Sequence, residues 1–163
     1  MRLKIPMREF QNKTYWIVGA SEGLGRALAI QLAKVGTKVI ISARSEERLI
    51  GLSEEIGSNT MVLPMDVSDR SSVQKAFSKL PKSLDGFIFV SGVYWHMSAS
   101  SWDETKAEEM VDVNLVGAMR CLAHLIPKFI NQGFGHIVLT GSIAGYRGLP
   151  GSVGYCASKA GLM

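Results

Sequence analysis

The stretch Val18-Gly19-Ala20-Ser21-Glu22-Gly23-Leu24-Gly25 carries three glycines and joins two runs of different character. Residues 14–18 are rich in strand formers, and residues 26–34 are rich in helix formers with an apolar stripe. The stretch therefore predicts a strand followed directly by a helix. The first glycine permits a tight turn, the second lets a ligand approach the backbone, and the third allows close packing. Free N–H groups at the helix start favour a pyrophosphate. A plain strand–helix turn is the alternative, because the spacing is not G-x-G-x-x-G.

The composition predicts one soluble globular domain over residues 1–163, since 47% of the residues are hydrophobic and 20% are charged. The net charge of +4 is spread along the chain, which argues against a nucleic-acid partner. The two cysteines and three histidines have no metal-ligand spacing, so no metal site is expected. Residues 1–13 lack the apolar segment of a secretory signal, and no apolar run approaches a membrane span. We therefore expect a cytoplasmic protein without a membrane partner.

Strand-like and helix-like segments alternate along the rest of the chain. Further strands are predicted at 38–42, 60–64, 86–90 and 135–140. Helices are predicted at 45–56, around 73–80, and from Asp103 or Glu104 to near Ile130, with Pro127 disturbing the last end. This alternation predicts a parallel sheet with right-handed crossovers. Ligands of such sheets bind beyond the carboxyl ends of the strands, which directs attention to the residues after each strand.

A second pattern is Tyr155-Cys156-Ala157-Ser158-Lys159, in which the phenol and the ammonium share one helix face. A neighbouring cation favours the phenolate and lowers the pKa of a tyrosine, which can then exchange a proton with a substrate oxygen. Ser142 directly follows the fifth predicted strand, and a glycine-rich loop can bring it beside Tyr155. A Tyr and a Lys four residues apart are also common on exposed helices, so this pair alone does not establish catalysis.

Six features in order make the chain resemble the short-chain dehydrogenase/reductase family from Lys13 to Met163. They are the glycine turn 19–25, Asp66-Val67, Gly92, Asn114, Ser142, and Tyr155 with Lys159. The resemblance implies an α/β fold, a Rossmann-type doubly wound parallel sheet in the strand order 3-2-1-4-5. It also implies an oxidoreductase that transfers a hydride between a nicotinamide dinucleotide and a small-molecule carbonyl or alcohol, with the protein supplying position and electrostatics.

The resemblance assigns a role to each catalytic candidate. Tyr155 is expected to be the acid/base, and Ser142 to hydrogen-bond the same substrate oxygen. Lys159 is expected to hold the nicotinamide ribose and favour the phenolate, and Asn114 to hold a water that extends the proton relay. Asp66 is expected to contact the adenine. Two alternatives stay open: Asn114 satisfies backbone groups, and Asp66 only caps the turn that follows it.

The cofactor is expected to be NADP(H), with NAD(H) as the alternative. Ala43 stands where NAD-preferring members of the family carry an acid, and Arg44 after it can fork a ribose 2′-phosphate. Glu22 argues against this preference, and Arg44 could instead pair on the surface with Glu46 or Glu47. The residues expected to bind the cofactor are Gly19, Ser21, Glu22, Gly23, Leu24, Gly25, Arg44, Asp66, Val67, Ser91, Gly92, Tyr155 and Lys159.

The sequence departs from the family pattern at three places. Val18 replaces a usual threonine, and Phe89-Val90 replaces two asparagines that normally line the cofactor cleft. The sequence ends at Met163, whereas the family continues with two more strands, further helices and a lid over the substrate. Without them the fifth strand is expected to be an open edge.

The early end leaves two interpretations, a sequence shorter than the natural protein or a truncated product. If the natural chain continues, a homo-oligomer is expected, either a dimer or a tetramer. A catalytically inactive dinucleotide-binding fragment or an interaction protein is the alternative to an enzyme.

Overall fold

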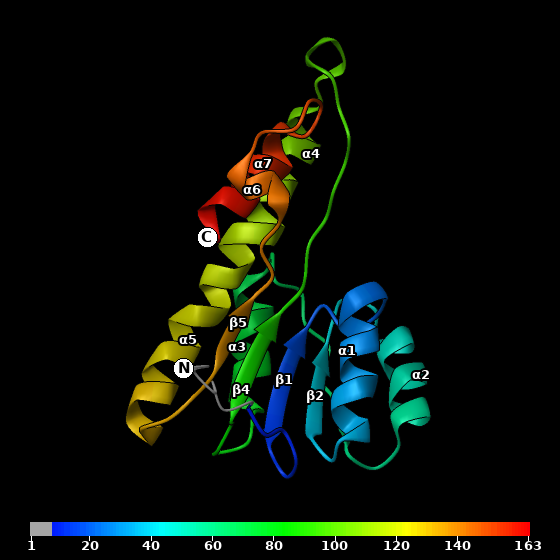
Figure 1. The fold of residues 1–163 in the computed structure, drawn as a ribbon, viewed down its shortest axis with the longest axis vertical. Helices are drawn as coiled ribbons and strands as arrows, with labels where there is room; N and C mark the ends of the chain where they lie inside the picture. The colour runs from blue at the N-terminus through cyan, green and yellow to red at the C-terminus, as the bar shows by residue number, and fades with distance from the viewer. Residues whose placement is uncertain (1–7) are drawn as a thin grey trace, which may run out of the picture.

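Residues 8–163 are described by a computed structural model with a five-stranded parallel sheet, in the order β3-β2-β1-β4-β5 (Figure 1). The predicted fold class and strand order are confirmed. The expectation about a secretory signal falls largely on residues 1–7, outside the described residues. The strands are β1 (Thr14–Val18), β2 (Lys38–Ser42), β3 (Thr60–Val62), β4 (Gly86–Phe89) and β5 (Ile137–Leu139). Backbone hydrogen bonds continue beyond β3, from Leu63 N to Ile41 O and from Met65 N to Ala43 O, and beyond β5, from Thr140 N to Phe89 O.

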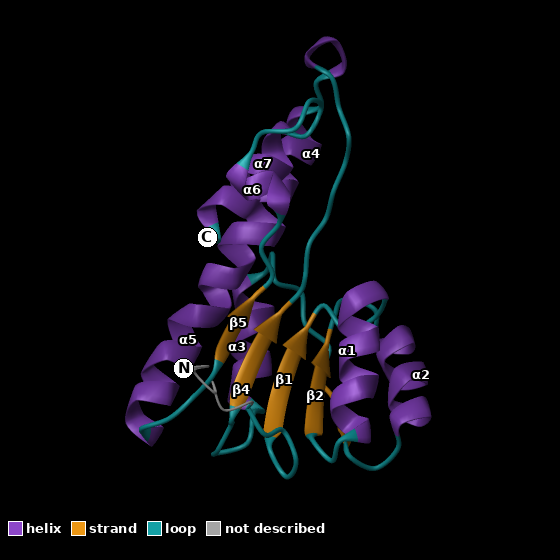
Figure 2. Cartoon of the chain, viewed as in Figure 1, coloured by secondary structure: helices purple, strands orange, loops and turns teal. Residues whose placement is uncertain are grey.

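Helices cover both faces of the sheet (Figure 2). Their bounds are α1 (Gly23–Lys34), α2 (Glu46–Ile56), α3 (Arg70–Ser78), α4 (Glu104–Val111), α5 (Gly117–Gln132), α6 (Ile143–Tyr146) and α7 (Val153–Gly161), with a 3-10 turn η1 (Ala99–Ser101) and a π turn η2 (Asp112–Val116). Four of the α-helices begin at a side-chain cap: Ser45 accepts from Arg48 N, Asp69 from Ser71 N, Asp103 from Lys106 N, and Ser142 from Ala144 N. These caps satisfy backbone donors that a helix leaves without partners.

The core has two layers because successive strand residues point to opposite faces of the sheet. Trp16 and Phe87 pack with α3 and α5, and their ring centroids lie 5.3 Å apart. Tyr15 and Ile17 pack on the other face with α1 and α2. All four side chains are buried. This sandwich holds the ends of β1, β2 and β4 in register, and the turns that follow them form the candidate site.

The longest helix contradicts one prediction. Pro127 was expected to disturb the helix end, but α5 continues through it to Gln132. Proline removes one backbone donor and leaves the carbonyl of Ala123 without its helical partner. Both residues are on the exposed face, where water can solvate that carbonyl. Gly133 then ends the helix in the left-handed conformation, at a φ of 77°.

The helical stretch Glu104–Gln132 is continuous over 29 residues, and its most apolar window has a mean hydropathy of 1.2. By length and composition it could cross a membrane, whereas the sequence predicts no apolar run that approaches a membrane span. The buried helix of a globular core meets the same criteria, and α5 packs Cys121, Leu125 and Phe129 against the sheet.

Candidate active site

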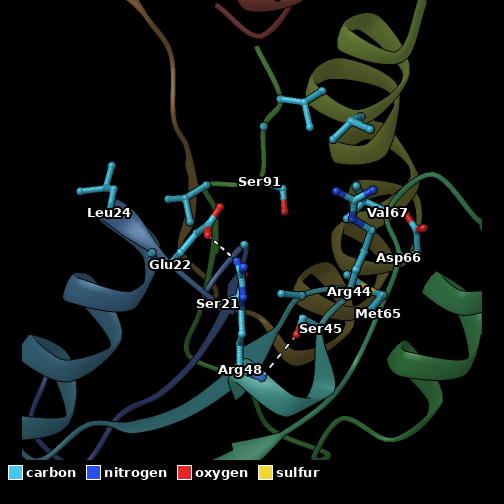
Figure 3. Close-up of a pocket in the computed structure, with 17 residues that line it drawn as sticks. Ser21, Glu22, Leu24, Arg44, Ser45, Arg48, Met65, Asp66, Val67 and Ser91 are labelled. Atoms are coloured by element: carbon cyan, nitrogen blue, oxygen red, sulfur yellow. Dashed lines mark hydrogen bonds and ion pairs between the residues drawn. The ribbon is translucent and has the colours of Figure 1, made fainter. Parts of the chain in front are cut away.

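A pocket of about 310 Å³ opens at the carboxyl ends of β1, β2 and β4 (Figure 3). Ten of the predicted cofactor-binding residues line it: Gly19, Ser21, Glu22, Leu24, Gly25, Arg44, Asp66, Val67, Ser91 and Gly92. Three predicted residues are outside this lining, namely Gly23, Tyr155 and Lys159. Five lining residues are outside the predicted cofactor-binding set: Ser45, Arg48, Met65, Val93 and Val113.

The glycine turn is shaped by contacts that exclude side chains. A Cβ on Gly19 would lie 2.5 Å from Ser91 N, and its φ of +97° also disfavours other residues. A Cβ on Gly25 would lie 2.1 Å from the carbonyl oxygen of Gly19. Gly23 has a φ of +54° and faces open space. The turn therefore presents bare backbone and the first N–H groups of α1 to the pocket, an arrangement that suits an anionic phosphate.

Two arginines after β2 line the pocket. Arg44 is exposed, and it forms no ion pair with Glu46 or Glu47 in the part of the chain that the structure describes. Arg48 lies in the first turn of α2, and its Nη1 is 2.5 Å from Oε2 of Glu22. Extending the search after each strand by one helical turn would have found Arg48 from the sequence.

Asp66 caps the turn that follows it and also lies in the pocket lining, and its contact with an adenine stays a prediction. Its Oδ1 accepts from Ser68 N at 2.9 Å and from Ser68 Oγ at 2.6 Å, so it caps the turn after β3. The residue also lines the pocket together with Val67. The cap holds this carboxylate at the pocket wall.

Apolar packing stands where the family has two asparagines. Phe89 is buried in the core, and a Cβ on Gly25 would meet Val90 Cγ2 at 2.7 Å. The backbone N–H groups of Val90 and Ser91 both donate to Val18 O, at 2.9 and 3.0 Å. The neighbouring strands are therefore tied by backbone bonds here, and the pocket wall keeps its shape without the amides.

Asn114 is fully buried in the π turn η2 and joins three segments. Its Oδ1 accepts from Val93 N at 2.7 Å, and its Nδ2 donates to Val93 O at 3.0 Å and to Ser158 Oγ at 3.1 Å. Both donors of the amide are therefore used. Asn114 thus connects the loop after β4 to α7. The alternative considered from the sequence, in which it only satisfies backbone groups, covers the bonds to Val93 but not the bond to Ser158. Its predicted water-holding role stays a prediction.

Tyr155 and Lys159 lie together on α7, next to the pocket rim. Lys159 is only 4% exposed, its Nζ donates to Thr140 O at 2.8 Å, and it lies 5.7 Å from the centroid of the Tyr155 ring. Burial lowers the pKa of Lys159. A Cβ on Gly92 would be 3.9 Å from this Nζ, so the ammonium adjoins the pocket. Tyr94, which the sequence analysis did not name, packs edge-on against Tyr155 at 5.0 Å.

Ser142 is the N-cap of α6, where its Oγ accepts from Ala144 N at 3.2 Å. A Cβ on Gly145 would lie 2.8 Å from Lys159 O, so α6 packs closely on α7. The glycine-rich loop therefore begins against the Tyr–Lys helix, and the placement of Ser142 beside Tyr155 stays a prediction. The hydrogen bonds within residues 8–163 include none between Ser142 and Tyr155. The same range holds no group of three or more metal-ligating side chains.

The fold and the pocket define a doubly wound α/β protein with a nucleotide-type cleft at the strand ends. The family model for short chain dehydrogenases matches residues 13–163, and the chain belongs to that family. The family is one of oxidoreductases, and membership implies a nicotinamide dinucleotide, NAD(H) or NADP(H).

Curated relatives and solved structures agree with this assignment. An uncharacterized oxidoreductase of Listeria monocytogenes is 33% identical over 156 residues, covering 91% of this chain and 62% of the relative. The 3-oxoacyl-[acyl-carrier-protein] reductase FabG of Rickettsia typhi is 33% identical over 157 residues, covering 96% of this chain and 65% of the relative. A short chain dehydrogenase structure from Bacillus anthracis has the same fold, with a TM-score of 0.88 and 24% identity over 94% of this chain and 65% of that one. The chain thus spans 62 to 65% of the length of these relatives.

Proposed function

We propose that this chain is an NADP(H)-dependent oxidoreductase that interconverts a carbonyl and an alcohol. The observation that carries the proposal is the buried Lys159 ammonium, which lies 5.7 Å from the centroid of the Tyr155 ring and adjoins Gly92 of the pocket lining. A phenol, a cation and a phosphate-type cleft in one place suit hydride transfer coupled to proton transfer.

The pocket residues fit the proposed cofactor. Gly19, Gly23 and Gly25 leave bare backbone at the start of α1 for the pyrophosphate, and a side chain at two of these positions would collide with neighbouring backbone. Arg44 would hold a 2′-phosphate, and no acidic residue stands at Ala43 to oppose it. When bound, the nicotinamide supplies or accepts the hydride.

The chain's own residues would manage the proton and the substrate oxygen. Tyr155 would donate its phenolic proton to a carbonyl oxygen or accept one from an alcohol. The Oγ of Ser142 already accepts from Ala144 N, which leaves its O–H free to donate to the same substrate oxygen. Lys159 uses one donor on Thr140 O, so two others remain for the ribose hydroxyls.

Asn114 would act on this site through position. Its bonds to Val93 and Ser158 hold the pocket loop against α7, and we keep for it the proposed water of the proton relay. Asp66 and Val67 would lie against the adenine. The FabG relatives, by their name reductases of a 3-oxoacyl group, support a carbonyl substrate. We further propose a cytoplasmic location and a homo-oligomer, with no nucleic-acid or membrane partner.

The test is NADPH oxidation by the 163-residue chain with a panel of apolar ketones, aldehydes and a 3-oxoacyl thioester. Tyr155→Phe should lower kcat by about 10²-fold or more while NADPH still binds. Tyr146→Phe is the matched control, because Tyr146 is 84% exposed on α6. Undiminished turnover in Tyr155→Phe would refute the proposed acid/base.

A non-catalytic dinucleotide-binding or interaction protein is the second candidate. It is favoured by the exposed apolar residues around the Ser142 cap, where Ile143 is 82% exposed. NADPH binding without turnover on every member of the panel would select this candidate.

A further inference from the structure

An ion pair lies across the candidate cofactor pocket. Glu22 belongs to the glycine turn and Arg48 to the first part of α2, and both line the pocket. Figure 3 shows Arg48 reaching toward Glu22, whereas Arg44 rises on the other side of the cavity. The side chains of Glu22 and Arg48 are 74% and 60% exposed. Water and ligands can therefore reach both partners of this pair.

A second ion pair joins α1 itself to α2 and has a different position. Arg26 of α1 pairs with Glu55 of α2, and neither residue lines the pocket. The packing of α1 on α2 therefore has its own ion pair away from the cavity. The Arg26–Glu55 pair therefore only joins the two helices. The Glu22–Arg48 pair also neutralises a charge in the pocket lining.

We propose that Glu22 competes with the ribose 2′-phosphate of the cofactor for Arg48. This inference rests on the proposed dinucleotide site. With a 2′-phosphate bound, Arg48 leaves Glu22 and, together with Arg44, holds the phosphate from two sides. When the ribose of the cofactor carries a 2′-hydroxyl instead, the Glu22–Arg48 ion pair stays intact and Arg44 has no phosphate to bind.

The chemistry of the groups favours this exchange. A phosphate offers more charge and more acceptor oxygens than a carboxylate, and a guanidinium binds either in a forked geometry. Releasing Arg48 from Glu22 costs little. An exposed ion pair of this kind changes a binding constant by a factor of at most about five. Glu22 therefore reduces 2′-phosphate affinity without abolishing it. This accounts for an acid in a turn where the proposed NADP(H) preference would favour a base.

The test measures binding by calorimetry, with no turnover required. The full chain is titrated with adenosine 2′,5′-bisphosphate and with 5′-AMP, which differ only in the 2′-phosphate. Glu22→Gln should tighten the bisphosphate about two- to fivefold, and it should change 5′-AMP by less than twofold. Arg48→Gln should weaken the bisphosphate alone, and the gain from Glu22→Gln should disappear in the double variant.

Arg26→Gln is the matched control, because it breaks the other ion pair between α1 and α2. It should leave the ratio of the two affinities unchanged. The inference is overturned if Glu22→Gln changes both ligands equally, or if its effect persists without Arg48. A lower affinity for the bisphosphate in Glu22→Gln also overturns it.

The proposed function fails by different results. If the unaltered chain binds neither nucleotide, the dinucleotide site and the inference are both refuted. If Arg44→Gln leaves the preference for the bisphosphate intact, the proposed role of Arg44 is wrong. The competition between Glu22 and the phosphate is then still decided by the Glu22 and Arg48 variants.

Discussion

Replacing Asn114 by leucine should destabilise the fold and weaken cofactor binding together. The amide makes three buried hydrogen bonds, two to the backbone of Val93 and one to Ser158. Leucine has a similar size but neither donors nor acceptors. At about 1 kcal/mol for each bond, the variant should lose about 3 kcal/mol of unfolding free energy. For a chain of this size that corresponds to a fall in Tm of about 6–12 °C.

Urea unfolding gives the free energy, and NADPH titration gives the binding. Gln132→Leu is the matched control at the far end of α5, where the amide bonds Leu84 O at 2.7 Å and Phe134 O at 2.6 Å. It should lower stability but leave NADPH affinity unchanged. Asn114→Leu should also weaken NADPH, because Val93 lines the pocket and loses its anchor.

Two results would contradict this reasoning. An unfolding free energy within about 1 kcal/mol of the unaltered chain would mean that the three bonds contribute little. A large loss of stability with unchanged NADPH affinity would mean that Asn114 supports the fold but does not position the pocket loop.

Three further predictions concern packing, charge and thiol reactivity. Gly25→Ala should abolish NADPH binding in a titration and lower the urea midpoint, since its Cβ would be 2.1 Å from Gly19 O; unchanged binding would show that the turn can relax. Burial lowers the pKa of Lys159, so the folded state binds fewer protons than the unfolded state between that lowered pKa and 10.5, and stability rises with pH across this window. Lys159→Met should remove that rise in urea unfolding at a series of pH values, and a persistent slope would assign it to other groups. Burial raises the pKa of Cys121 to about 12, so iodoacetamide at neutral pH should label the half-buried Cys156 first, and Cys121 only after unfolding, as read by mass spectrometry.

The sequence predicted the strands and most of the pocket because their causes are local. A continuous apolar run such as 86–90 is typical of a buried strand. Glycines stand in the turn because a Cβ at Gly19 or Gly25 would collide with neighbouring backbone. The prediction for Pro127 is wrong because the effect of this proline is not set locally. Its effect depends on whether the freed carbonyl of Ala123 meets water, and that depends on which face of α5 the sheet covers.

Contacts between distant segments could not be predicted in this way. Arg48 and Glu22 are separated by 26 residues and meet only because α1 and α2 pack side by side on one face of the sheet. The bonds of Asn114 to Val93 and Ser158 likewise need η2, α7 and the loop after β4 to converge. Spacing along the chain carries no information on such pairs.

The amino-acid sequence by itself determined the strand–helix alternation, the parallel sheet and the identity of most pocket residues. These follow from hydrophobic periodicity and from glycines that no other residue can replace. Only the tertiary structure decided which charges face each other across the pocket, how deeply Lys159 is buried, and that the Asn114 amide is used by the Val93 backbone and the Ser158 hydroxyl. Those properties depend on distances between residues far apart in the chain, and packing of the two helical layers on the sheet sets those distances.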